Sequence, residues 1–210
     1  MTTPPESPAF LTSDHISHRT RNILLSRMEQ ETLSRPEVLS LSAFAVLDAL
    51  IPVLLPQDSV LPGHPLNLAV RIDRALAGPR DGWRFAELPP DAQAWEAALL
   101  TLDDVSVRRH GMRVLHLAAD LRGELLDDLL AGTIGLQAKG RLTPAQMQRW
   151  SGDLRADVVE CFLSDPTVQA ALGISANLTG GDDIIQGFHS VSPDSREDFE
   201  PSPTAPVFQD

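Results

Sequence analysis

The stretch TPAQMQRWSGDLRADVVECFL, residues 143–163, decides the fold class of this 210-residue chain. Thr143 can cap a helix, Pro144 suits the first helical position because no N–H is needed there, and Gln146 can close a capping box. Apolar residues then recur at three- and four-residue spacing, which is typical of a helix with one buried face. These residues are Met147, Trp150, Leu154, Val158, Cys161 and Phe162. The stretch therefore predicts a long amphipathic helix.

Similar signals predict helices along most of the preceding chain. Glycine or proline follows several apolar periodic segments, as at Gly78-Pro79, Gly111 and Gly132, and such residues end helices. No segment shows the alternation of a convincing strand. The expected helices span residues 14–31, 40–55, 66–77, 89–110, 118–131 and 143–163, with a short one between Ser164-Asp165-Pro166 and Gly173. We predict an all-α fold, an irregular compact helical bundle followed by a long non-regular C-terminal tail.

The tail, residues 174–210, carries glycines and prolines without helical periodicity. Segments of this length are uncommon in compact domains unless they are functional or disordered. Its apolar residues are more than a purely solvated tail would contain. They are Ile174, Leu178, Ile184, Ile185, Phe188, Phe199 and Phe208. We therefore predict a disordered lead over 1–13, a helical domain over 14–173, and a tail over 174–210 that wraps the helical body or a partner subunit.

The composition argues against several classes of protein. A net charge of −12 argues against a nucleic-acid partner, which requires a basic surface. No run of 18 apolar residues is present, so we expect no membrane span. One cysteine excludes an internal disulfide framework and any cysteine-based metal centre within the chain. Residues 1–10 show no hydrophobic segment and no Arg-Arg pair, so no export signal is visible.

One group of side chains invites a catalytic interpretation. Asp182, Asp183 and His189 lie within eight residues and could form an acid–base group. The alternative is that the two aspartates cap turns by accepting backbone N–H groups. Gly180-Gly181 lacks the strand and helix context of a phosphate-binding loop, so its expected role is to let the backbone turn or approach another chain. We predict no catalytic, cofactor-binding or metal-binding residue.

Four residues are candidates for contact with a partner subunit: Cys161, Gly181, Phe188 and Phe199. Gly181 would provide backbone freedom, and the two phenylalanines would be apolar anchors. Cys161 could pair between subunits, although a small buried core residue is the alternative interpretation. The pair His15-x-x-His18 lacks a third metal ligand at suitable spacing, which favours a solvated helix end.

Three segments, in order, resemble the gluconate 2-dehydrogenase subunit 3 family. LDALIPVLLPQD at 47–58 is similar to an early family helix, WEAALLTLD at 95–103 to a second, and DVVECFLSDP at 157–166 to a third. The glycine-rich tail follows in the expected place. These proteins are the small, or gamma, subunits that accompany flavin-dependent dehydrogenases of the glucose–methanol–choline type.

The resemblance implies an all-α accessory subunit that is not itself an enzyme and binds no cofactor. It would associate with a large flavoprotein subunit that carries FAD and oxidises a sugar or alcohol, often with a cytochrome c subunit. Many members carry a twin-arginine signal and accompany the large subunit to the periplasm, whereas the absence of a visible signal here leaves the cytoplasm open. The alternative is a stand-alone helical enzyme or an adaptor that uses Asp182, Asp183 and His189. The substrate belongs to the partner and is not indicated by this sequence.

Overall fold

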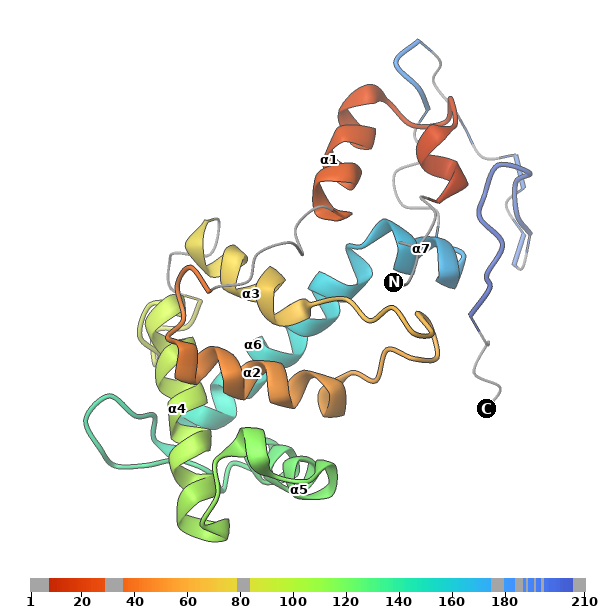
Figure 1. Cartoon of the computed structure of the whole chain (residues 1–210). Helices are drawn as coiled ribbons and strands as arrows, with labels where there is room; N and C mark the ends of the chain where they lie inside the picture. Colours follow the sequence, from red (N-terminus) through yellow and green to blue (C-terminus); the bar gives the residue numbers. More distant parts are fainter. Residues whose placement is uncertain are drawn as a thin grey trace. The chain divides into compact units, whose positions relative to one another are not determined.

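The computed structural model describes residues 8–28, 36–78, 84–174, 180–183, 187, 189–190, 192–193 and 195–205. These residues form seven α-helices, two 3-10 helices and one isolated bridge, and no strand occurs among them (Figure 1). The predicted all-α class is therefore confirmed.

The chain divides into two compact units, each described by itself. The terminal unit comprises residues 1–31, 57–66 and 162–210, and the helical unit comprises 32–56 and 67–161. The body predicted as one domain over 14–173 thus contributes to both units. The reason is that the 57–66 loop and the last helix pack with the two ends of the chain rather than with the central helices.

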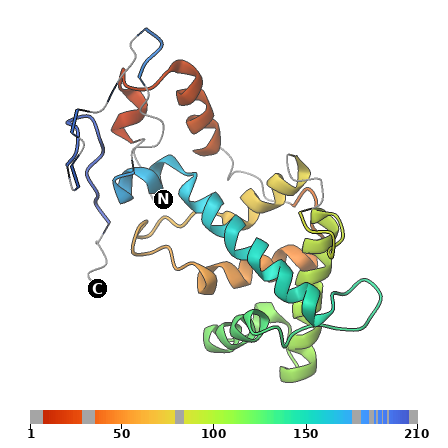
Figure 2. The same cartoon turned by 180° about the vertical axis from the view of Figure 1, so that it is seen from behind.

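The helical unit is built around α2. This helix contacts α3, α4, α5 and the 3-10 helix η3, and the two opposite views show these elements around it (Figure 1, Figure 2). The bounds are α2 Leu41–Leu54, α3 Leu68–Ala77, α4 Asp91–His110, η3 Val114–His116, α5 Ala119–Leu130 and α6 Pro144–Leu163. Pro52 lies inside α2, and the helix continues for two residues beyond it.

Several helix ends follow the sequence signals, although α1 begins at His18 rather than at the predicted residue 14. Ser40 caps α2, since the Ala43 N–H donates to its Oγ at 3.2 Å. At α6 the predicted capping box is present: the Thr143 N–H donates to Gln146 Oε1 at 3.1 Å, and the Gln146 N–H donates to Thr143 Oγ1 at 3.4 Å. Gly111 ends α4 with a φ of 70°, a left-handed conformation that favours glycine.

Two tryptophans lie at the centre of the helical unit. Trp95 of α4 and Trp150 of α6 are fully buried and pack edge to face, with ring centroids 5.2 Å apart and planes at 82°. The predicted stripe of α6 is buried except at Cys161, which is half-buried. Two apolar residues near the C-terminal ends of their helices are not buried: Val107 is 46% exposed and Leu130 is 41% exposed.

Buried carboxylates hold the connections of this unit. Asp73 accepts the backbone N–H groups of residues 37, 38 and 39, at 2.5, 3.2 and 2.7 Å, and so fixes the approach to α2. Asp103 is also buried. Its carboxylate accepts hydrogen bonds from Nε of Arg113 at 2.7 Å and from the Val114 N–H at 3.0 Å, and these bonds fix the turn after α4.

The terminal unit contains η1 Ala9–Thr12, α1 His18–Met28 and α7 Pro166–Leu172. Its apolar cluster is formed by Phe10, Leu11, Ile16 and Leu24. Within the lead over 1–13, residues Ala9–Thr12 form the 3-10 helix η1, in which Phe10 and Leu11 are buried. Residues 1–7 lie outside the described part.

Candidate partner-binding site

Phe199, one of the four predicted interface residues, packs within its own chain. It is half-buried against the apolar cluster of the terminal unit, and its ring stacks on that of His15, with centroids 4.5 Å apart. At this position the tail contacts the chain's own N-terminal region. Phe188, a second predicted anchor, lies outside the described residues.

The tail backbone closes the end of α7. The N–H groups of Thr204 and Ala205 both donate to the carbonyl oxygen of Ala171, at 2.8 and 2.9 Å. Nη1 of Arg196 donates to the carbonyl oxygen of Gly173 at 2.8 Å. The last carbonyl groups of a helix have no partner within the helix, so the tail supplies donors that α7 lacks.

Gly181 lies where the tail approaches the N-terminal region. A Cβ at Gly181 would lie 2.5 Å from the carbonyl oxygen of Asp14, a distance that side chains do not adopt. The preceding residue, Gly180, forms the isolated bridge with Ile16. Glycine is therefore required here for close approach to another segment of the same chain.

Asp182 and His189, two residues of the candidate acid–base group, form hydrogen bonds with different parts of the chain. Asp182 Oδ2 accepts the N–H of His18 at 3.1 Å and so caps the first residue of α1. The backbone N–H groups of His189 and Ser190 donate to the Glu197 carboxylate, and these bonds hold its pKa below the usual value. The polar hollow that contains Asp182 and Asp183 does not include His189. These contacts favour the capping interpretation of Asp182.

Cys161 occupies a half-buried position on α6. Burial, reinforced by the charges of Asp157 and Glu160, raises the pKa of its thiol to about 12. A thiol with so high a pKa stays protonated near neutrality, which suits packing better than nucleophilic chemistry or disulfide exchange.

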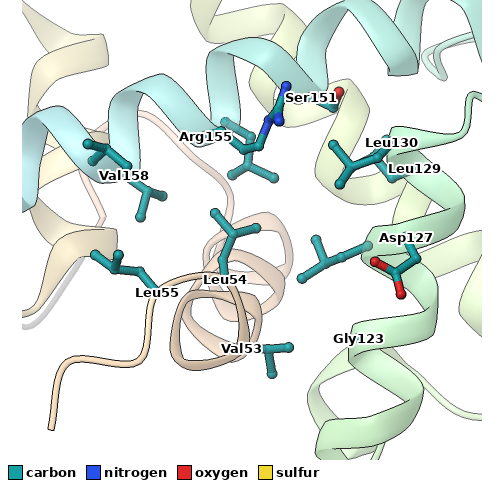
Figure 3. Close-up of a pocket in the computed structure, with 13 residues that line it drawn as sticks. Val53, Leu54, Leu55, Gly123, Asp127, Leu129, Leu130, Ser151, Arg155 and Val158 are labelled. Atoms are coloured by element: carbon teal, nitrogen blue, oxygen red, sulfur yellow. The ribbon is translucent and has the colours of Figure 1, made fainter. Parts of the chain in front are cut away.

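An apolar pocket of about 360 Å³ opens in the helical unit, between the end of α2, α5 and α6 (Figure 3). Its apolar walls are Val53, Leu54, Leu55, Leu126, Leu129, Leu130, Leu154, Val158 and Val159. Val159 is 43% exposed, so this lining reaches the protein surface. Exposed apolar patches of this kind mark interaction sites in many soluble proteins.

One wall of the pocket includes a glycine within α5. Gly123 lines the pocket, and a Cβ added there would contact only Val53 Cγ1, at an ordinary 3.9 Å. A larger side chain at this position would occupy the space that is now open. Glycine in a helix interior disfavours the helix relative to alanine, so the open space has a cost in stability.

The face of α6 turned away from the pocket carries a buried ionic cluster. Nη1 of Arg84 contacts Oδ1 of Asp153 at 2.6 Å and Oδ1 of Asp157 at 3.1 Å, and its Nε lies 4.0 Å from Asp91. Burial raises the pKa of Asp157 to about 7, against the opposing attraction of Arg84. The Arg84 guanidinium thus pairs with three carboxylates, and these pairs connect the start of α4 with α6.

The described part of the chain holds no group of three His, Cys, Asp or Glu side chains that could bind a metal ion. Within the same residues, no helix has the length and apolar character needed to cross a membrane.

The pocket was not predicted from the sequence. It joins three helices that are separated along the chain, and periodicity assigns Leu130 to a core face without showing that the space beside it is open. A glycine inside the apolar period of α5 was the available signal, because glycine in a helix interior commonly marks close packing or function.

Residues 42–177 match the family model described as Gluconate 2-dehydrogenase subunit 3. The match spans 136 of the 210 residues, which is more than half of the chain. It covers the region in which the three sequence segments indicate the same resemblance. Neither a curated protein nor a solved structure matches the chain.

Proposed function

The chain belongs to the gluconate 2-dehydrogenase subunit 3 family, and we propose that it is a non-catalytic small subunit of a dehydrogenase complex. In this proposal it binds and stabilises the large subunit, which carries FAD and oxidises a sugar or alcohol. The family match carries the proposal, since the family is named for one subunit of a dehydrogenase. A cytochrome c subunit would complete the complex as electron acceptor.

The pocket between α2, α5 and α6 supports a binding role. Side chains that dominate protein interfaces insert into well-packed pockets from which water is excluded. The volume of about 360 Å³ is near the lower end of the range for ligand pockets and suits one or two large side chains. Because three helices form its walls, the pocket is held by regular structure rather than by a loop.

The same contact would explain a role in maturation or export. An apolar docking surface on the large subunit would be exposed to water until it is covered, and covering it would favour the folded, FAD-loaded state by mass action. In this proposal the small subunit acts in a chaperone-like manner and remains as part of the heteromer.

Co-expression with the large subunit tests the proposal. We expect the two chains to elute together in gel filtration, with flavin absorbance and dye-linked sugar or alcohol oxidation in the shared peak. The chain purified alone should show no flavin absorbance and no turnover. A large subunit that is equally soluble, FAD-loaded and active without this chain, and elutes apart from it, would contradict the proposal.

A further inference from the structure

The pocket has opposite charges on two of its walls. Asp127 of α5 and Arg155 of α6 line it, and Figure 3 shows them on the two helices that face each other across it. Both side chains are exposed, and neither forms an ion pair with any residue in the described part of the chain. The charges therefore stay available to a segment that enters the pocket.

The negative wall extends along α5. Asp120, Glu124 and Asp127 follow one another at four- and three-residue spacing, which places them on one exposed face of the helix beside the pocket. Within the described residues none of the three has an ion-pair partner. The neighbouring Asp128, by contrast, is paired with Arg109. Among the described residues, no side chain thus forms an ion pair with the acidic face beside the pocket.

Arg155 provides a cation on the opposite wall of the pocket. Arg113 and Arg141 each pair with an aspartate, at 2.7 Å in both cases, in a protein whose net charge is −12. Arg155 lies beside apolar residues of the pocket lining, and the structure gives it no such partner among the described residues. Its guanidinium is therefore available for a carboxylate from outside the chain.

We propose that the pocket receives an apolar side chain from a segment of the large subunit with a defined charge pattern. The segment carries lysine or arginine on the side that meets α5 and a carboxylate on the side that meets Arg155. This inference rests on the proposed function and adds the chemistry of the partner segment. The apolar side chain supplies most of the affinity, while the two charges set the direction of the segment and speed its association.

Filling the pocket tests the first part of the inference. In the co-expressed complex, Gly123→Leu should raise the Kd for the large subunit by at least about tenfold, because the leucine occupies the space of the incoming side chain. The matched control is Gly152→Leu on the exposed side of α6, where an added Cβ meets no atom within 4 Å. Thermal melting of each isolated variant checks its folding.

A second variant guards against misfolding of the first. Val159→Glu places a charge on the exposed rim of the pocket and should weaken assembly to a similar extent, whereas Val107→Glu, at a comparably exposed valine on α4, should not. Wild-type affinity in both Gly123→Leu and Val159→Glu would overturn the docking position.

Charge reversal tests the second part. Asp127→Lys and Arg155→Glu should each raise the Kd roughly three- to fivefold, and Asp127→Lys should also reduce the loss of affinity on adding salt. Asp58→Lys and Lys139→Glu, at exposed positions outside the pocket, are the controls. Unchanged or tighter binding in either reversal would overturn the charge pattern.

These outcomes separate the two proposals. If the wild-type chain assembles with the large subunit but the pocket variants behave as their controls, the inference fails and the proposed function stands. If the wild-type chain does not assemble with the large subunit, the proposed function fails and the inference fails with it.

Discussion

The helical unit and the terminal unit reach their folds by different routes. In the helical unit, apolar stripes on capped helices pack around α2, and Trp95 and Trp150 meet at the centre. In the terminal unit, three separate pieces of chain meet with little regular structure between them. Apolar periodicity therefore determines the first unit, whereas individual contacts between distant residues determine the second.

In the terminal unit, side chains form hydrogen bonds with backbone groups that have no hydrogen-bond partner within a helix. Gln57 donates through Nε2 to the Leu66 carbonyl at 3.1 Å and accepts the Leu66 N–H at 2.8 Å, which closes the 57–66 loop. Asp182 caps α1 from a position 164 residues away in sequence. Such bonds satisfy irregular backbone that would otherwise need water. Loss of a single partner should thus have local effects in this unit and global effects in the other.

The largest expected effect is in the helical unit. Trp150→Ala removes a fully buried ring and should lower the free energy of unfolding by roughly 3–5 kcal/mol. Urea denaturation measures the change, with Val159→Ala on the exposed rim of the same helix as control. If the two variants unfold at the same urea concentration, Trp150 is not the centre of this core.

The ionic cluster of the helical unit should make its stability depend on pH. Asp157 has a pKa of about 7 when folded and an ordinary value of 3.8, so between these values the folded state holds a proton that the unfolded state has released. The contribution of Asp157 therefore falls as pH rises from about 4 to about 7. The expected change is on the order of 4 kcal/mol.

Comparison of wild type with Asp157→Asn isolates this effect. The stability of wild type relative to the variant should be greatest near pH 4 and should shrink towards pH 7. Cys161→Ser, on the same helix, is the control, because a thiol with a pKa of about 12 does not titrate in this range. A relative stability of Asp157→Asn that does not vary with pH would mean that the cluster does not shift this carboxyl.

The same contrast explains how much the sequence could predict. The ends of α4 and α6 follow from Gly111 and from the Thr143–Gln146 capping box, because these signals act within one turn of helix. The burial of Asp103 could not be predicted, since it depends on Arg113 and on a turn whose path is set by tertiary packing. The partners of Gly181 and Phe199 lie more than 160 residues away, and no local pattern identifies them.

Phe199→Ala tests whether the tail stabilises the terminal unit alone. Loss of a half-buried ring stacked on His15 should lower stability by about 2 kcal/mol. Amide hydrogen exchange should then accelerate in α1 and α7 but not in α4, because local unfolding follows local contacts. Equal acceleration in α4 would show that the two units unfold as one, which would remove the distinction drawn between them.

The smallest expected effects come from replacing one glycine by alanine in each unit. Gly173 has a φ of +68°, and a Cβ there would lie 2.9 Å from Cδ and 3.0 Å from N of Pro203, so Gly173→Ala should destabilise the terminal unit by about 1–2 kcal/mol. Gly123 is helical and has room for a methyl group, so Gly123→Ala should stabilise the helical unit by about 0.5–1 kcal/mol.

Thermal melting of the two variants beside wild type compares them directly. Opposite signs are expected because Gly173 allows the tail to approach closely, whereas Gly123 lies within a helix that has room for a methyl group. If Gly123→Ala is less stable than wild type, the pocket has no room for the added methyl group. The pocket would then be smaller than the proposed apolar side chain requires.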